Sequence, residues 1–215
     1  MSRANATLAH QFEDTEQQRE ASTLGMWIFL ATEIMFFGGM FLGYIVYRSV
    51  YSEGFAAASN RLDVWLGSIN TAVLICSSFT MVLAVCNAAA GRRRALTGAL
   101  LLTIVLGCVF LGIKLHEYRL KFEEQLVPGA SFVFPGPLSA PAQIFFSFYF
   151  AMTGMHAVHM IIGIGLLARL AFGASRGQYS PDYYTPVELI GLYWHFVDIV
   201  WIFLFPLLYL VGRHQ

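Results

Sequence analysis

The chain has 215 residues, of which 57% are hydrophobic and only 12% are charged. A soluble domain carries roughly 25% charged residues, so this chain has too few to cover a globule with polar surface. Its 13 Lys and Arg balance its 13 Asp and Glu, which leaves no net positive charge to attract nucleic acid. The three cysteines lie inside apolar runs, and we interpret them as packing residues rather than a disulfide or zinc set. This composition excludes a soluble enzyme and indicates an integral membrane protein.

Residues 1–23 are polar and rich in acidic side chains. They lack the basic stretch and short apolar core of a cleavable signal peptide, so we expect the first apolar run to act as the insertion signal. The sequence predicts two parts: a polar cytoplasmic segment over residues 1–23 and a transmembrane domain over residues 24–212.

Five apolar runs are long enough to cross a membrane. A hydrocarbon core about 30 Å thick needs about 20 apolar residues in a helix. The runs are apolar on all sides, whereas barrel strands would be short and alternating, so we expect an all-α integral membrane bundle of five transmembrane helices. The predicted spans are Leu24–Tyr47, Val64–Ala90, Ala95–Ile113, Ala142–Ala168 and Val187–Val211.

Basic residues near the span ends indicate the orientation. Their totals on the two sides are almost equal, but the run Arg92–Arg94 fills the very short link between the second and third spans. We therefore predict a cytoplasmic N-terminus and a C-terminus outside the membrane.

Glu33 lies in the middle of the first span, among bulky apolar neighbours and with no Lys or Arg in the same span. An ionised carboxylate at the centre of a membrane costs roughly 3 kcal/mol on insertion scales and more in simulations. We expect Glu33 to face other protein or bound lipid. It either takes part in a proton path or donates one structural hydrogen bond.

The fourth and fifth spans carry further polar side chains. His156 and His159 share one face of the fourth span, while Glu188, His195 and Asp198 share a face of the fifth and Trp194 lies on another. We expect the two polar faces to pack against each other. Three roles remain open at this point: haem or metal ligation, binding of a lipid headgroup, and hydrogen bonds that hold two helices together.

The end of the third span carries Lys114, Glu117, Tyr118 and Lys121 on one face, with His116 beside them. Lysine side chains that extend toward water and interfacial tyrosines are typical of a membrane boundary. We therefore predict that Glu117 and Tyr118 are interfacial.

Four motifs, in order along the chain, resemble subunit III of the haem-copper terminal oxidases. They are GMWIFLATEIMFF over residues 25–37, the pair Glu117–Tyr118, TGMHAVH over residues 153–159 and YWHFVDIVW over residues 193–201. The resemblance runs from about Gly25 to Gly212, nearly the whole chain. It points to a short, five-helix form that lacks the first two helices of the seven-helix members.

The resemblance implies a subunit without catalytic residues, metal ligands or cofactors of its own. Haem and copper would lie in partner subunits of a proton-pumping cytochrome c oxidase in a bacterial inner membrane. The chain would pack beside subunit I, with subunit II and a small subunit IV in the same complex, and would bind phospholipid and support proton uptake. Glu33 would be the family's intramembrane carboxylate, and the polar residues of the later motifs would be structural or lipid-contacting.

Three alternatives to this function are a subunit III of a quinol oxidase, an accessory subunit of a nitric oxide reductase, and an independent transporter that uses Glu33. The choice of electron donor is made in other subunits, so this chain does not encode it.

Overall fold

The computed structural model describes residue 12 and residues 14–210, and this part of the chain folds into helices without a β-strand. Six α-helices precede a final π-helical turn. They are α1 (Thr15–Val50), α2 (Ser52–Ser59), α3 (Val64–Ala89), α4 (Arg93–Glu123), α5 (Ser139–Ser175), α6 (Thr185–Phe205) and η2 (Pro206–Leu210).

Five of the described helical segments are long and apolar enough to cross a membrane, namely α1, α3, α4, α5 and α6 with η2. The all-α, five-helix fold predicted from the sequence is confirmed. Several helices extend beyond the predicted spans, because polar residues continue them: α1 begins at Thr15, where the Asp14 side chain accepts a hydrogen bond from Gln17 N at 2.7 Å. Residues 1–11 and 13 of the predicted polar segment, and residues 211 and 212 of the predicted membrane domain, lie outside the described residues.

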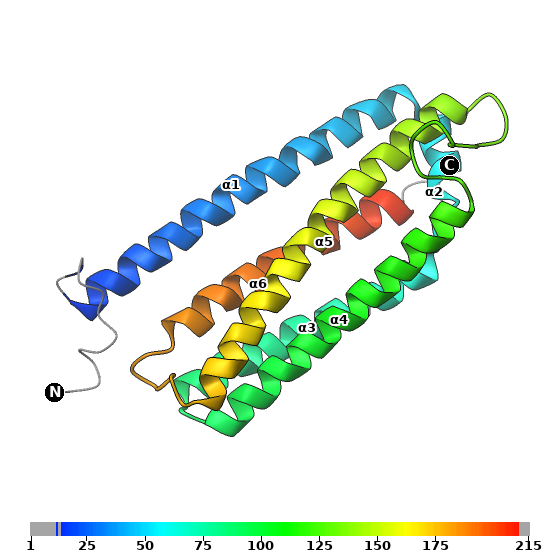
Figure 1. The fold of residues 1–215 in the computed structure, drawn as a ribbon. Coiled ribbons are helices and arrows are strands. Elements are labelled where there is room, and N and C mark those ends of the chain that lie inside the picture. The colour runs from blue at the N-terminus through cyan, green and yellow to red at the C-terminus, as the bar shows by residue number, and fades with distance from the viewer. Residues whose placement is uncertain (1–11, 13, 211–215) are drawn as a thin grey trace.

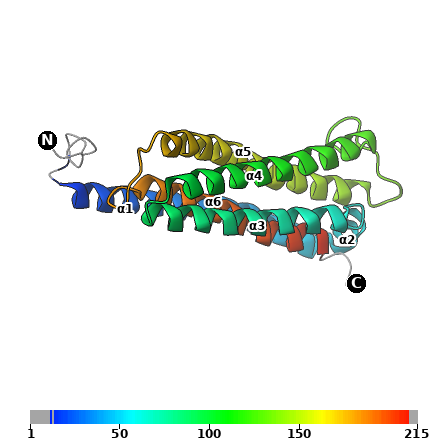
Figure 2. The same ribbon diagram turned by 90° about the horizontal axis from the view of Figure 1, so that it is seen from below.

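The long helices run antiparallel in two layers. Figure 1 shows each helix reversing direction relative to the one before it, with α2 at the end of the bundle where α1 finishes. Figure 2 shows α4 and α5 in one layer and α1, α6 and α3 in the other. Helix α6 therefore lies between α1 and α3, and one of its sides faces away from the α4–α5 layer.

Helix α1 attaches to the bundle along a narrow stripe. Its buried residues are Leu30, Phe37 and Tyr44, which are seven residues apart and so lie on one line along the helix. The Tyr44 hydroxyl donates a hydrogen bond to the Leu207 carbonyl at 2.8 Å. Most other apolar side chains of α1 are exposed, among them Met35, as expected for a helix that faces lipid.

Trp194 of α6 occupies the centre of the bundle. It is fully buried, and its Nε1 donates to Ser77 Oγ of α3 at 3.0 Å. Gly107 of α4 and Gly163 of α5 make room for its ring, since a Cβ added at either glycine would lie 2.9 Å from an indole carbon. Four helices therefore meet at one indole ring.

We predict that Gly163→Ala destabilises the bundle by about 1–3 kcal/mol, because the added methyl group overlaps the rigid Trp194 ring. The matched control is Gly165→Ala on the same helix, where no atom lies within 4 Å of the added Cβ. The thermal unfolding midpoint of the detergent-solubilised protein should fall for the first variant and stay level or rise for the second. Equal midpoints would contradict the close packing at Trp194.

Candidate functional site

Glu33 and His159 form a pair that joins α1 to α5. Glu33 Oε2 lies 3.1 Å from His159 Nε2, and His159 Nδ1 lies 2.9 Å from the Met155 carbonyl oxygen. A carbonyl oxygen only accepts hydrogen bonds, so Nδ1 carries a proton and donates a hydrogen bond to the Met155 carbonyl. The Nε2–Oε2 contact then holds one proton, which sits either on the carboxyl or on the imidazole. The pair is thus a hydrogen bond across which a proton can change sides.

The surroundings of this pair are largely apolar. The side chains of Glu33 and His159 are 19% and 11% exposed. The Phe37 ring centroid lies 5.4 Å from that of His159, and the Tyr193 hydroxyl donates to the His159 backbone carbonyl at 2.9 Å. Glu33 faces protein in this placement, as predicted. His159 contacts α6, as expected, through the ring of Tyr193, whose centroid lies 6.5 Å away, and its contact with α1 was not predicted.

A second polar cluster joins α4, α5 and η2 in the interior. Lys114 Nζ donates to Glu117 Oε2 at 3.0 Å, to the Tyr149 hydroxyl at 3.0 Å and to the Tyr209 hydroxyl at 2.7 Å. The Tyr209 hydroxyl in turn lies 2.6 Å from Glu117 Oε1. An ammonium has three protons to donate, so the Lys114 cation is completely satisfied. Aromatic rings enclose it, with the Tyr149 centroid 4.6 Å from Nζ.

The expectation that Lys114 extends toward water is wrong, because the side chains of Lys114 and Glu117 are only 3% and 2% exposed. A sequence signal for their burial exists. The buried residues of α4 recur every three or four positions from Leu96 to Lys121, and Lys114 and Glu117 continue the stripe formed by Gly107 and Phe110. The predicted span stopped at residue 113 and so missed this continuation.

The polar residues of the last two spans do not form the single cluster expected. His156 is buried with its ring centroid 5.4 Å from that of Phe110 and 5.3 Å from that of Trp201. His195 Nδ1 lies 2.8 Å from Ser78 Oγ, so it contacts α3 instead of α5. Asp198 also lies beside α3, in a groove with Ser78.

Glu188, the remaining acid of the predicted cluster, lies near the start of α6. Its Oε2 is 4.0 Å from an Arg19 guanidinium nitrogen of α1, and both side chains are partly exposed. Such an ion pair contributes little to stability. It does place the polar beginning of α1 beside that of α6.

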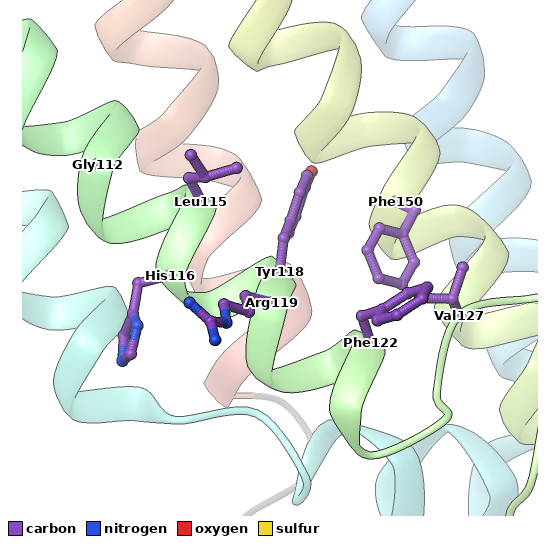
Figure 3. Close-up of a pocket in the computed structure, with 8 residues that line it drawn as sticks. All are labelled: Gly112, Leu115, His116, Tyr118, Arg119, Phe122, Val127 and Phe150. Carbon is purple, nitrogen blue, oxygen red and sulfur yellow. The ribbon is translucent and has the colours of Figure 1, made fainter.

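An open groove of about 720 Å³ runs between α4 and α5 near Tyr118. Figure 3 shows Phe122, Val127 and Phe150 clustered on one side of Tyr118, with His116 on the other side. Leu115 and Phe122 are strongly exposed in this groove. The Arg119 side chain at its edge forms an ion pair with Glu123 at 3.0 Å. The groove combines apolar walls with a basic edge.

Metal ligation was one of the roles left open by the sequence. In the part of the chain that the structure describes, no three His, Cys, Asp or Glu side chains are grouped so as to hold a metal ion. The three histidines of the predicted cluster contact different neighbours: His159 contacts Glu33, His195 contacts Ser78, and His156 contacts aromatic rings.

The fold and the helix-joining polar groups define an all-α, multi-pass membrane protein. The sequence model of the family described as cytochrome c oxidase subunit III matches residues 4–213. The chain belongs to this family, as the motifs around Glu33, Glu117, His156 and Asp198 predict.

Individual relatives include two kinds of oxidase. The chain is 31% identical to the cytochrome c oxidase subunit 3 of Thermostichus vulcanus, with 88% of this chain and 87% of that protein covered. It is also 31% identical to the quinol oxidase subunit 3 of Bacillus subtilis, with 97% and 94% covered. A cytochrome bo(3) ubiquinol oxidase subunit 3 of Pseudomonas putida is 26% identical over 90% of this chain and 87% of its own length. The chain is therefore a subunit III of the haem-copper oxidase family and part of a respiratory oxidoreductase.

We predict that Lys114→Met destabilises the protein by about 3–5 kcal/mol, because it leaves the buried Glu117 charge without its cation. The double variant Lys114→Met with Glu117→Gln should recover at least half of the loss, since no unpaired charge then remains. Chemical unfolding in mixed micelles measures both effects as a double-mutant cycle. The exposed pair Arg119–Glu123 is the matched control, and Arg119→Met should cost less than about 1 kcal/mol. Equal losses at the two pairs would contradict the structural role of the buried cluster.

Proposed function

We propose that the chain is the non-catalytic subunit III of a proton-pumping, oxygen-reducing terminal oxidase whose donor is cytochrome c. It packs beside subunit I, and subunit II and a small subunit IV belong to the same complex. Haem and copper are held by the partner subunits, while this chain binds phospholipid and supports proton uptake and durable turnover. Family membership, which already places the chain in a respiratory oxidase, supports this proposal.

The observation that carries the proposal is the Glu33–His159 pair. Its contact holds one proton, and the pair lies at the side of the bundle, where α1 packs on α5. A carboxyl and an imidazole at hydrogen-bond distance are able to pass a proton between them, as proton relays in membrane proteins do. This is the chemistry expected of a group that supports proton uptake by a neighbouring subunit.

The surroundings of His156 support a chain without its own haem. Haem ligation would require open space for the macrocycle beside the ligating histidine. The Phe110 and Trp201 rings occupy that space, and His156 is only 1% exposed.

The second candidate is the same subunit of a quinol oxidase. The Bacillus subtilis quinol oxidase subunit is as similar to this chain as the cytochrome c oxidase subunit of Thermostichus vulcanus, and the alignment covers more of the chain. The two other candidate functions are an accessory role in nitric oxide reduction and independent transport, and the experiment described below distinguishes both from an oxidase subunit.

The chain is a multi-pass membrane protein, and we place it in a bacterial inner membrane with its N-terminus in the cytoplasm. The basic residues at the α1-starting end of the bundle support this orientation, since Arg92–Arg94 and Arg176 lie at helix ends on that side.

We place a bound phospholipid in the groove between α4 and α5. Its exposed Leu115 and Phe122 suit acyl chains, and His116 and Arg119 at the edge suit a phosphate. A molecule in this groove would cover apolar side chains next to the end of α4.

The experiment that tests the function is purification of the intact complex through a tag on this chain, followed by subunit identification and activity assays. Oxygen consumption should be driven by reduced cytochrome c. Oxygen consumption driven only by a quinol would establish the second candidate in its place. Nitric oxide reduction, or transport by the chain reconstituted alone, would overturn the proposal.

We predict that Glu33→Gln leaves the complex assembled but slows turnover modestly. The amide still donates a hydrogen bond to His159 Nε2, but it has no transferable proton. The loss should stay well short of the roughly tenfold change that about 1.36 kcal/mol of barrier produces. The measurement is oxygen consumption per assembled complex, with Glu188→Gln at the exposed ion pair as the control. Complete loss of oxygen reduction in a fully assembled complex would contradict an auxiliary role.

We predict that Leu115→Trp reduces the amount of phospholipid retained by the purified complex, because the indole fills the groove between α4 and α5. Val105→Trp is the control, since Val105 is exposed on the same helix outside the groove. Native mass spectrometry counts the retained lipids. Equal lipid content in the two variants would exclude this groove as the lipid site.

A further inference from the structure

Asp198 of α6 is a buried acid whose two carboxyl oxygens are not both satisfied by the described chain. Its residue is 3% exposed, and within residues 14–210 the donor beside it is the Ser78 hydroxyl. That hydroxyl, which also lies 2.8 Å from His195 Nδ1, has a single proton and so satisfies at most one of the two oxygens. Buried polar groups in proteins are almost always hydrogen-bonded, so this carboxyl calls for a donor from outside the described chain.

Asp198 lines a groove of about 450 Å³ between α3 and α6. The two helices belong to the layer that also contains α1 (Figure 2). Its edges are strongly exposed apolar side chains, namely Ile75, Phe79, Ile199 and Ile202. The groove therefore opens sideways, toward the membrane, and carries an incompletely satisfied acid on its inner side.

The depth of the site restricts what reaches it. Asp198 lies near the middle of the segment Thr185–Leu210, and Ser78 lies near the middle of α3. At about 1.5 Å per residue, each is roughly 20 Å from either end of its helix. A phospholipid headgroup at the membrane surface does not extend that far into a hydrocarbon core about 30 Å thick. A donor at this depth comes from another membrane-spanning segment.

We infer that the groove between α3 and α6 receives a transmembrane helix of a partner subunit, which donates a hydrogen bond to Asp198 from a hydroxyl, amide or basic side chain. This inference rests on the proposed function, in which the chain works only within an oxidase complex. The complementarity is electrostatic: Ser78 serves at most one oxygen of Asp198, so the groove presents an acceptor oxygen with no donor in the described chain, and the partner supplies that donor. Ser78 and Thr71, both small, line the groove and allow a helix to approach closely.

A photo-crosslinker tests the occupant directly. Benzoylphenylalanine replaces Phe79, which is 63% exposed at the edge of the groove, in the complete complex in its native membrane. The control position is Val105 of α4, which is 56% exposed and lies outside the groove. The expected result is a covalent link from position 79 to a helix of another subunit, near a hydrogen-bond donor. Links from position 79 to lipid or quinol alone would overturn the inference.

A substitution at the acid provides a second, independent readout. Asp198→Leu removes the acceptor, so a donor on the partner helix would be left unpaired. The fraction of complexes that lose this subunit in detergent should then rise about tenfold, the scale of one charge-assisted hydrogen bond. Asp198→Asn keeps an acceptor oxygen and should retain the subunit better, and Ile202→Leu at the groove edge should behave as wild type. Retention of Asp198→Leu equal to or better than wild type would show that no donor faces the acid.

The two proposals fail in different ways. A wild-type complex that contains oxidase subunits and reduces oxygen supports the proposed function whatever position 79 contacts. Lipid-only crosslinks in that same complex would remove only the partner-helix assignment.

Discussion

The absence of water inside a bilayer governs this structure. A polar group within the hydrocarbon region is stabilised mainly by partners in protein, because no solvent satisfies it there, and His156, which has only aromatic rings around it, is an exception among the described residues. Lys114 shows the constraint most clearly, since it makes three hydrogen bonds, to Glu117, Tyr149 and Tyr209, within a cage of aromatic rings. A cation that lysine would ordinarily extend to water has become the point where α4, α5 and η2 are joined.

The buried polar groups differ in whether this chain itself supplies their partners, and this difference indicates what each group does. Those that are satisfied inside the chain join helices: Trp194 to Ser77, Tyr44 to the Leu207 carbonyl and Lys114 to Glu117. The Glu33–His159 pair also joins helices, but its shared proton gives it a chemistry that the others lack. Asp198 has at most the Ser78 hydroxyl as a donor within the described chain, so one of its oxygens is left for contact with another molecule.

The sequence predicted the number and type of the membrane helices, because a run of about 20 apolar residues in a membrane almost always forms a helix that spans it. It also singled out Glu33, since a lone acid among bulky apolar neighbours is conspicuous. The motifs that resemble subunit III predicted the family, which the comparisons confirmed.

The partners of the site residues could not be predicted from spacing. Residues three apart share a helix face, yet His156 contacts α4 and α6 while His159 contacts α1, because that face meets several neighbours at once. His195 and Asp198 were assigned to the wrong neighbour for the same reason, as the rotation of α6 depends on the packing of Trp194 against Gly107 and Gly163. A lysine near a helix end, such as Lys114, can extend its side chain into water or bury it against other helices. The sequence does not distinguish these cases, because the outcome depends on how α5 and η2 pack around the side chain.

The central claim is that the polar groups of this chain build and position a subunit whose redox centres belong to its partners. The most direct test is to dissociate the purified oxidase in detergent, isolate this chain, and record its visible spectrum together with its iron and copper content. The expected result is a colourless chain, with both metals and the haem absorption found in the other subunits. Haem or stoichiometric copper that stays with the isolated chain would contradict the claim.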